Sequence, residues 1–247
     1  MIYVMSDIHG NTRRFDSIHK QIDLQPEDTL YILGDVIDRF PDGIKLLRRI
    51  MAMPNVKMLL GNHEYMMLQS INQPYQNYEY VDDAPESIRC NLWYRNGGDV
   101  THQYWKRIRK TMRQEIVDYL QSLPLNYDVH VNGKHYKLVH GAPLDAYEVF
   151  AEFFHNIAHY AVWKRWRRYD VLSGKYTLIF GHTPTITYQD SEPMRIWHGM
   201  NMIGIDCGGG FSEDPLDDYY GYGRLACLRL DDMKEYYSEE PGCEAKE

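Results

Sequence analysis

The sequence predicts an α/β fold in which two β-sheets stack as a sandwich and helices flank them on the outside. Short apolar runs that end at glycine or polar clusters recur along the chain, as is typical of buried strands. Helical spacing of apolar residues follows the first three runs, and a hairpin pattern with further strands occupies the second half. No repeat or linker divides the 247 residues, so we expect a single domain over residues 1–247.

The first half of the chain is expected to contain three strand–loop–helix units. Runs rich in Ile, Leu, Val and Tyr predict strands at residues 2–5, 29–33 and 56–60. Apolar residues at helical spacing follow each strand: Phe15, Ile18 and Ile22 behind the N-cap Asn11, then Ile44, Leu47 and Met51 behind Pro41, and then residues 63–71. Such units imply right-handed crossovers and largely parallel strands.

The second half alternates helical stretches with strands. We expect helices within residues 85–123 and 144–169. Residues 128–131 and 135–139 flank Asn132-Gly133, which predicts a β-hairpin. Further strands are expected at 177–180, 202–206, 224–230 and 235–238, with antiparallel pairing in this half. This order of elements fits two stacked sheets better than one doubly wound sheet.

Composition and charge disfavour several classes of protein. The chain has 35 acidic and 27 basic residues, a formal net charge of −8, so a nucleic-acid polymer is not an expected partner. No apolar run reaches the roughly 18 residues that a membrane-spanning helix requires. Four scattered cysteines and early polar residues favour a reduced, cytoplasmic protein. Residues 231–247 form an acidic tail, which we expect to be mostly solvated.

Metal-competent side chains follow five of the predicted strands. They are Asp7 with His9, Asp35, Asn62 with His63, His140, and His182. Neighbouring strands lie only about 5 Å apart, so side chains at their carboxyl ends converge. Mixed Asp, Asn and His ligands suit Mn²⁺, Fe²⁺ or Zn²⁺. A single such junction is typical of a turn, but five in this order predict a metal centre.

These junctions resemble the motifs of a known superfamily. Ser6-Asp7-Ile8-His9-Gly10, Gly34-Asp35-Val36-Ile37-Asp38-Arg39, Gly61-Asn62-His63-Glu64, His140-Gly141 and Gly181-His182-Thr183 are similar to the calcineurin-type metallophosphoesterases. Within that superfamily the chain most resembles the phosphoprotein phosphatases, and among these the bacterial and phage lambda-type serine/threonine phosphatases. Asn96-Gly97-Gly98 and Trp163-Lys164-Arg165 add to the likeness. The resemblance implies the two-sheet metallophosphoesterase sandwich flanked by helices.

The resemblance also assigns roles to individual residues. It implies that Asp7 and His9 bind one metal ion and that Asp35 bridges two. The second ion would be held by Asn62, His140 and His182. His63 would act as a general acid that Asp38 orients, and Arg39 and Arg165 would bind the phosphate. The implied cofactor is a pair of divalent ions, with Mn²⁺ favoured and Fe or Zn as alternatives.

Some of these assignments have alternatives. His63 could be a further ligand or a structural histidine, Asp38 could cap the following helix, and Arg39 could pair with nearby acids. Three other basic residues compete with Arg165 for the phosphate: Lys164, Arg167 and Arg168. Glu64 is expected to begin a helix, where an acid suits the N-terminal dipole, rather than to bind metal. Phe40 and Leu60 depart from the pattern of the resembled branch.

The function implied by the resemblance is hydrolysis of phosphate monoesters by direct attack of a metal-activated hydroxide. The expected substrates are phosphoserine and phosphothreonine on proteins, with phosphotyrosine or small phosphoesters as variants. One alternative is hydrolysis of dinucleoside polyphosphates. Another is a non-catalytic binding module, which would be expected to have lost a ligand or His63, yet all are present. Residues 72–123 are expected to form much of the substrate-facing surface, and the oligomeric state is left open.

Overall fold

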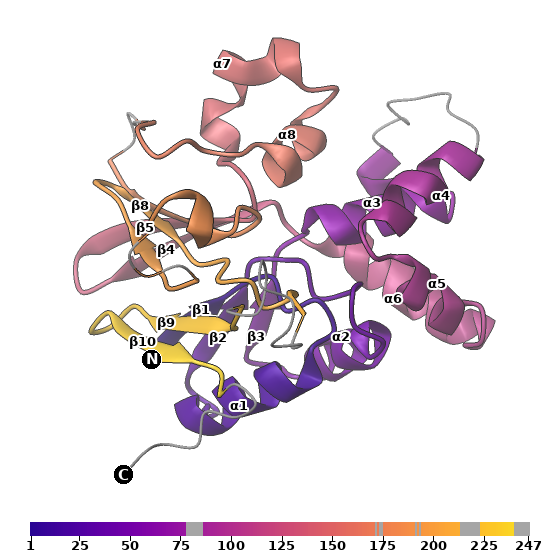
Figure 1. Cartoon of the computed structure of the whole chain (residues 1–247), viewed down its shortest axis with the longest axis horizontal. Coiled ribbons are helices and arrows are strands. Elements are labelled where there is room, and N and C mark those ends of the chain that lie inside the picture. Colours follow the sequence, from indigo (N-terminus) through magenta and orange to yellow (C-terminus); the bar gives the residue numbers. More distant parts are fainter. Residues whose placement is uncertain are drawn as a thin grey trace.

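A computed structural model describes residues 1–77, 86–170, 172, 175–190, 192, 194–212 and 223–239. Its centre consists of two five-stranded sheets, with helices around them (Figure 1). The predicted two-sheet α/β sandwich is confirmed. Among the described residues, no helix combines the length and the apolar character that crossing a bilayer would need.

The first sheet is built largely from the N-terminal third of the chain. Its strand order is β10-β9-β1-β2-β3, with β1 (Ile2–Met5), β2 (Thr29–Ile32) and β3 (Val56–Met58) parallel, as predicted. Strands β9 (Ala226–Arg229) and β10 (Lys234–Tyr237) join antiparallel. The helices that follow the parallel strands are α1 (Thr12–Ile22), α2 (Gly43–Met51) and α3 (Asn62–Ser70).

One sequence feature of the first sheet behaves as expected, and two differ. The Asn11 side chain caps α1 by accepting a hydrogen bond from the Arg14 backbone N–H at 3.0 Å. Helix α2 begins after Asp42 rather than at Pro41. Residues 231–237, expected as solvated tail, include β10, and the Asp231 carboxylate accepts a hydrogen bond from the Ile2 backbone at 2.7 Å. Residues 240–247 lie outside the described part of the chain.

The second sheet has the order β4-β5-β6-β8-β7. Its strands are β4 (Asn126–Val131), β5 (Lys134–Val139), β6 (Thr177–Phe180), β7 (Trp197–His198) and β8 (Met202–Gly204). The predicted hairpin is confirmed: Asn132 and Gly133 have φ values of 51° and 76°, which a tight turn between β4 and β5 requires.

The prediction of antiparallel pairing is wrong for the centre of this sheet. Strand β6 pairs in parallel with both β5 and β8. The reason is the long connection from β5 to β6, which crosses over through α7 (Tyr147–Phe150) and α8 (Ile157–Trp163). Only the outer pairs β4–β5 and β7–β8 are antiparallel within this sheet.

Alternating side chains of the strands fill three buried layers. In β1, Tyr3 and Met5 face the helices α1 to α3, whereas Val4 packs between the two sheets. Leu138 and Ile179 of the second sheet meet Val4 in that central layer. A third cluster covers the outer face of the second sheet and contains Val139, Phe180, Tyr160 and Trp166 among its members. Stacking of the sheets therefore fixes the ends of β1, β2, β5 and β6 relative to one another.

The two stretches predicted to be helical are interrupted. Residues 86–122 form α4 (Glu86–Arg95), α5 (Asp99–Trp105) and α6 (Lys110–Ser122), since Gly97, at φ 88°, breaks the first helix from the second. The expectation of helix over 144–169 holds only for short pieces, and 164–169 is not helical. Single turns of tighter helix complete the structure: Tyr75–Asn77, Leu144–Ala146, Ala151–Phe153 and Thr185–Thr187. Figure 1 shows α4 to α6 to the right of the sheets, and α7 and α8 above the sheets.

Candidate metal centre

The six predicted metal ligands lie together just beyond the ends of five strands, five of them in loops and Asn62 at the start of α3. Their side chains are almost fully buried, at 0% to 5% exposure: Asp7, His9, Asp35, Asn62, His140 and His182. Strands β1, β2 and β3 supply the first four, and β5 and β6 of the other sheet supply the two histidines. The centre therefore lies where the ends of the two sheets meet.

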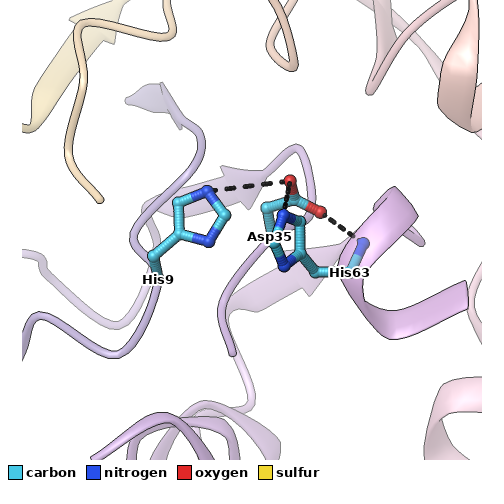
Figure 2. A group of neighbouring side chains, drawn as sticks. All are labelled: His9, Asp35 and His63. Carbon is cyan, nitrogen blue, oxygen red and sulfur yellow. Dashed lines mark hydrogen bonds and ion pairs between the residues drawn. The ribbon is translucent and has the colours of Figure 1, made fainter. Parts of the chain in front are cut away.

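Asp35 occupies the middle of this centre. One carboxylate oxygen, Oδ2, lies 3.8 Å from Nε2 of His9 and 3.8 Å from Nε2 of His63. The other oxygen, Oδ1, lies 3.6 Å from Nε2 of His140. Two clusters with metal-ligand spacing share this residue: His9, Asp35 and His63, and Asp35, His140 and His182. Figure 2 shows His9 and His63 beside the Asp35 carboxylate. A carboxylate with an oxygen in each cluster fits a bridging ligand.

Asp7 and Asn62 lie at the edges of the two clusters. Oδ1 of Asp7 lies 3.9 Å from Nε2 of His9, and its Oδ2 accepts a hydrogen bond from the His182 backbone at 3.0 Å. Oδ1 of Asn62 lies 2.8 Å from Nε2 of His140. The structure thus brings together all six residues that the sequence predicted as ligands.

The chemistry of the histidine donors fits divalent cations. Nδ1 of His9 and of His140 lies 3.1 Å and 2.8 Å from the carbonyl oxygens of Ile37 and Leu33, so each Nδ1–H donates there. In a neutral ring this leaves Nε2 with a lone pair directed into the centre. In His140 that lone pair faces Oδ1 of Asn62 at 2.8 Å, as two ligands of one cation would. Nε2 of His182 is buried with no hydrogen-bond partner among the described residues. These inward-facing lone pairs and carboxylates are what a pair of metal ions requires.

Burial controls the ionisation of these groups. It lowers the pKa of His9 and of His182 well below the usual range, and the neighbouring cationic groups add to the effect. Burial also raises the pKa of Asp35 well above its usual range, and the carboxylates of Asp7 and Glu64 reinforce this rise. Neutral histidines are competent ligands, and positive charge placed among them would stabilise the carboxylate.

The loops that carry the site have strained backbones. Six of the predicted site residues have φ between 52° and 74°, a left-handed conformation that non-glycine residues seldom adopt: Asp7, His9, Asp35, Asp38, Arg39 and His182. Gly61 packs against the Asp35 loop so closely that a Cβ would collide with the Asp35 backbone. Such strain persists only where surrounding contacts hold it, as they do here.

Glu64 provides one of these contacts, which sequence reasoning missed. It lies in the first turn of α3, as expected, but its carboxylate also accepts hydrogen bonds from the backbone N–H groups of Asp35 at 2.9 Å and Val36 at 2.8 Å. It accepts a further bond from Gly61 N–H at 3.1 Å. The spacing of Glu64 three residues after the N-cap was a signal for the last contact only.

His63 and Asp38 form a buried pair beside the metal clusters. Nδ1 of His63 lies 2.7 Å from Oδ2 of Asp38. Burial raises the pKa of Asp38 to about 7, although hydrogen bonds from Thr101 and Trp93 oppose the rise. Burial lowers the pKa of His63 to about 4, although Asp35 opposes this shift. Asp38 does not cap α2, whose N-cap is Asp42. Because Nδ1 faces Asp38, the other ring nitrogen of His63, Nε2, points toward Asp35.

The predicted phosphate-binding arginines line one cavity. Its volume is about 530 Å³, and its walls include Arg39, Arg165, Ile186, Met194 and Phe211. Nη1 of Arg165 donates to the carbonyl oxygen of His182 at 2.9 Å, so its guanidinium lies next to the second cluster.

The three other basic residues considered for phosphate binding do not line this cavity. Nζ of Lys164 donates to the Arg165 carbonyl oxygen at 2.6 Å and lies 4.3 Å from the centre of the Trp166 ring. Arg167 and Arg168 are exposed and do not line this cavity. Of the four basic residues, the structure places Arg165 at the site.

A glycine-rich loop covers the first cluster and borders the same cavity. The buried Arg14 of α1 donates to the backbone carbonyl oxygens of Gly208, Gly209 and Phe211 at 3.0 to 3.2 Å. Gly210 lies against the His9 ring with no room for a Cβ. Arg14 therefore holds the loop that packs over His9. The sequence of helix α1 contains no feature that indicates this role for Arg14.

Comparisons with known proteins define the class. The model of the calcineurin-like phosphoesterase family matches residues 1–205, and the chain belongs to that family. With its buried His and Asp clusters, it is a metal-dependent phosphoesterase.

Curated relatives include symmetrical bis(5'-nucleosyl)-tetraphosphatases. The chain is 31% identical to the protein from Pectobacterium atrosepticum over 100 residues, 38% of this chain and 36% of that protein. The Yersinia pestis strain Pestoides F protein is 32% identical over 100 residues, 38% of this chain and 35% of the relative. The match thus spans about a third of the length of these relatives.

Solved structures share the fold over nearly the whole chain. A candidate diadenosine tetraphosphatase has a TM-score of 0.59 at 16% identity, covering 97% of this chain and 93% of its own. A protein serine/threonine phosphatase from Saccharomyces cerevisiae gives 0.53 at 15% identity, covering 96% and 79%. A cold-active protein-tyrosine phosphatase from a Shewanella species gives 0.52 at 16% identity, covering 96% and 80%. At such identities these structures support the fold alone.

Proposed function

We propose that this phosphoesterase hydrolyses dinucleoside polyphosphates of the diadenosine tetraphosphate type. The sequence resemblance favoured phosphoproteins and kept this substrate as an alternative. The curated relatives at 31% to 32% identity, which are tetraphosphatases, support the alternative better. They match only part of their own length, so the assignment depends on the site of this chain.

The cavity beside the metal centre is the observation that carries the proposal. Its volume of about 530 Å³ is within the range of small-molecule sites. The guanidinium groups of Arg39 and Arg165 offer paired N–H donors for the oxygens of a polyphosphate chain. Ile186, Met194 and Phe211 supply the apolar and aromatic surface that a nucleoside would contact. A phosphorylated serine would use only the charged part of this cavity.

The predicted ligands are proposed to hold two divalent ions. Asp7 and His9 would bind the first, Asn62, His140 and His182 the second, and Asp35 both. When bound, the ions supply Lewis-acid activation of the phosphoryl group and of the attacking water. The donor set of carboxylate, amide and imidazole favours Mn²⁺, with Fe or Zn as alternatives.

The protein side chains are proposed to divide the remaining work. His63 in its doubly protonated form donates the Nε2 proton to the oxygen of the leaving group, while the Asp38 carboxylate, 2.7 Å from Nδ1, holds the ring and stabilises the imidazolium. Arg39 and Arg165 bind non-bridging phosphate oxygens and lie in one cavity wall with the apolar residues. The nucleoside end of the substrate then lies against Phe211.

A phosphoprotein phosphatase is the second candidate, and the His63–Asp38 pair favours it. An acid positioned by a buried carboxylate is needed most when the leaving group is a poor one, such as the alkoxide of serine. The leaving nucleoside diphosphate of a tetraphosphate cleaved in the middle depends on the acid less.

One substrate panel separates these candidates. Diadenosine tetraphosphate, a phosphoserine peptide and an aryl phosphate are assayed side by side with Mn²⁺. We expect the highest kcat/KM for diadenosine tetraphosphate. Phe211→Ala should lower that value about tenfold, because base stacking on an aromatic ring contributes about 1–3 kcal/mol, and should leave the aryl phosphate unaffected. A higher kcat/KM for the phosphopeptide, unaffected by Phe211→Ala, would reject the proposal in favour of the second candidate.

A further inference from the structure

We propose that Trp93 is a positioning residue for the general acid His63, acting through Asp38. Trp93 lies in α4, a helix to which the sequence assigned only the general expectation of a substrate-facing surface. The inference rests on the acid role proposed above for His63.

A single oxygen of Asp38 joins the two side chains. Oδ2 of Asp38 lies 2.7 Å from Nδ1 of His63 and accepts a hydrogen bond from Nε1 of Trp93 at 2.8 Å. All three residues are buried, with exposures of 2%, 0% and 0% for His63, Asp38 and Trp93. An indole N–H can only donate, so its contact with this oxygen is unambiguous. Trp93 therefore fixes the orientation of the carboxylate that orients the acid.

Thr101 of α5 and Gly97 of the loop between α4 and α5 hold the backbone of Asp38 and Arg39. The Asp38 N–H donates to Oγ1 of Thr101 at 3.0 Å, and the Arg39 N–H donates to the carbonyl oxygen of Gly97 at 2.9 Å. Asp38 and Arg39 have φ values of 74° and 65°, so their left-handed backbones depend on these contacts. Helix α5 and the loop before it thus hold both the carboxylate behind the acid and the arginine beside the cavity.

Close packing leaves little freedom for the indole. Gly98 lies so near the Trp93 ring that a Cβ at this position would collide with it. Any buried indole N–H needs an acceptor, and here the acceptor is the same carboxylate oxygen that faces His63. Removing the donor would leave that buried carboxylate with one fewer hydrogen bond. The carboxylate could then rotate away from His63.

Trp93→Phe tests the proposal because it removes the N–H and keeps an aromatic ring. Rates are measured with Mn²⁺ on a series of aryl phosphates of increasing leaving-group pKa. We expect kcat to fall about tenfold on the poorest leaving group, the effect of one hydrogen bond to a charged group, and little on the best. In a His63→Asn background the same change should add no further leaving-group dependence, since both residues act in one step.

Trp105→Phe is the matched control. Trp105 is buried in the adjacent helix α5, where the Arg113 guanidinium lies 5.7 Å from its ring. This change should alter thermal stability without changing the dependence on the leaving group. Losses for Trp93→Phe that are equal along the whole series, or that add fully to those of His63→Asn, would overturn the proposal.

A spectroscopic measurement tests the contact without any assay. In Zn²⁺-loaded protein, the indole ¹H–¹⁵N resonance of Trp93 should shift upfield in Asp38→Asn, because a neutral amide is a weaker acceptor than a carboxylate. An unchanged resonance would overturn the proposal. The kinetic series uses aryl phosphates alone, so a protein that hydrolyses them but not diadenosine tetraphosphate would refute the proposed substrate and leave the role of Trp93 standing.

Discussion

The two sheets contribute to the metal centre in different ways. The first sheet supplies Asp7, His9, Asp35 and Asn62 from three successive parallel strands, β1 to β3. The second supplies His140 and His182 from β5 and β6, which are far along the chain. Ligands from the first sheet depend on short strand–loop–helix units. Those from the second arrive only when the two sheets stack.

Hydrogen bonds across the junction show how this stacking is held. The backbone N–H of His182 donates to Asp7 at 3.0 Å, and Nδ1–H of His140 donates to the Leu33 carbonyl oxygen at 2.8 Å. Each bond ties a ligand of the second sheet to a loop of the first. The second of the two proposed metal sites therefore depends on tertiary packing, whereas the first depends mainly on local structure.

The largest effect is expected at Asp35, which both sites share. Asp35→Ala should abolish binding of both ions and lower activity by at least about 10³-fold, because single electrostatic contacts in such sites contribute about 10²–10³-fold. His182→Ala should retain one ion, since His182 is a ligand of only one of the two sites. Metal content and rate are measured in both variants. Two ions retained in Asp35→Ala would refute the bridging role.

The next effect concerns His63. His63→Asn should lower kcat by about 10²–10⁴-fold on a phosphoserine peptide and by much less on an aryl phosphate with a good leaving group. Metal content should stay at the wild-type value. A variant that lost an ion, or lost equal activity on both substrates, would identify His63 as a ligand or a structural residue.

A smaller effect is expected at Arg165, which lies beside the second-sheet ligand His182. Arg165→Lys should lower kcat/KM about tenfold without loss of metal, because an ammonium cannot reproduce the paired hydrogen bonds of a guanidinium. Arg167→Lys and Arg168→Lys are the controls and should behave as wild type. Normal kinetics of Arg165→Lys beside an impaired Arg167→Lys or Arg168→Lys would contradict the assignment.

The smallest effect is expected at Glu64, within the first sheet. Glu64→Gln replaces an ionised acceptor of backbone N–H groups by a neutral one, so it should lower the free energy of unfolding by about 1–3 kcal/mol. Urea denaturation measures this, with the exposed Glu115→Gln as the control. An unchanged stability would mean that the hydrogen bonds to the Asp35 loop contribute nothing net.

The same contrast explains what the sequence could predict. Strands β1 to β3 and the ligands behind them were predictable, because each junction combines an apolar run with a glycine and a polar side chain. The parallel direction of β6 was not, since it follows from a crossover made of short, irregular helices. The local spacing of apolar residues does not show how a connection of this kind crosses the sheet, and so does not predict the strand direction.

The site shows a similar division. The residues predicted to bind metal through their own side chains stood out by type and spacing, as His140 and His182 did. Arg14 and Trp93 did not, because their roles depend on carbonyl oxygens or a carboxylate from remote loops. Inside a helix, a buried arginine or tryptophan is indistinguishable by sequence from one that merely packs.

The most direct test of the account is the number of divalent ions that each chain binds. Titration of metal-free wild-type protein with Mn²⁺, followed by calorimetry, should give two sites per chain, and His140→Ala should give one. Hydrolysis of an aryl phosphate should disappear with a chelator and return with Mn²⁺. A wild-type protein that binds one ion at saturation, or that keeps full activity after its metal is removed, would contradict the shared two-metal centre.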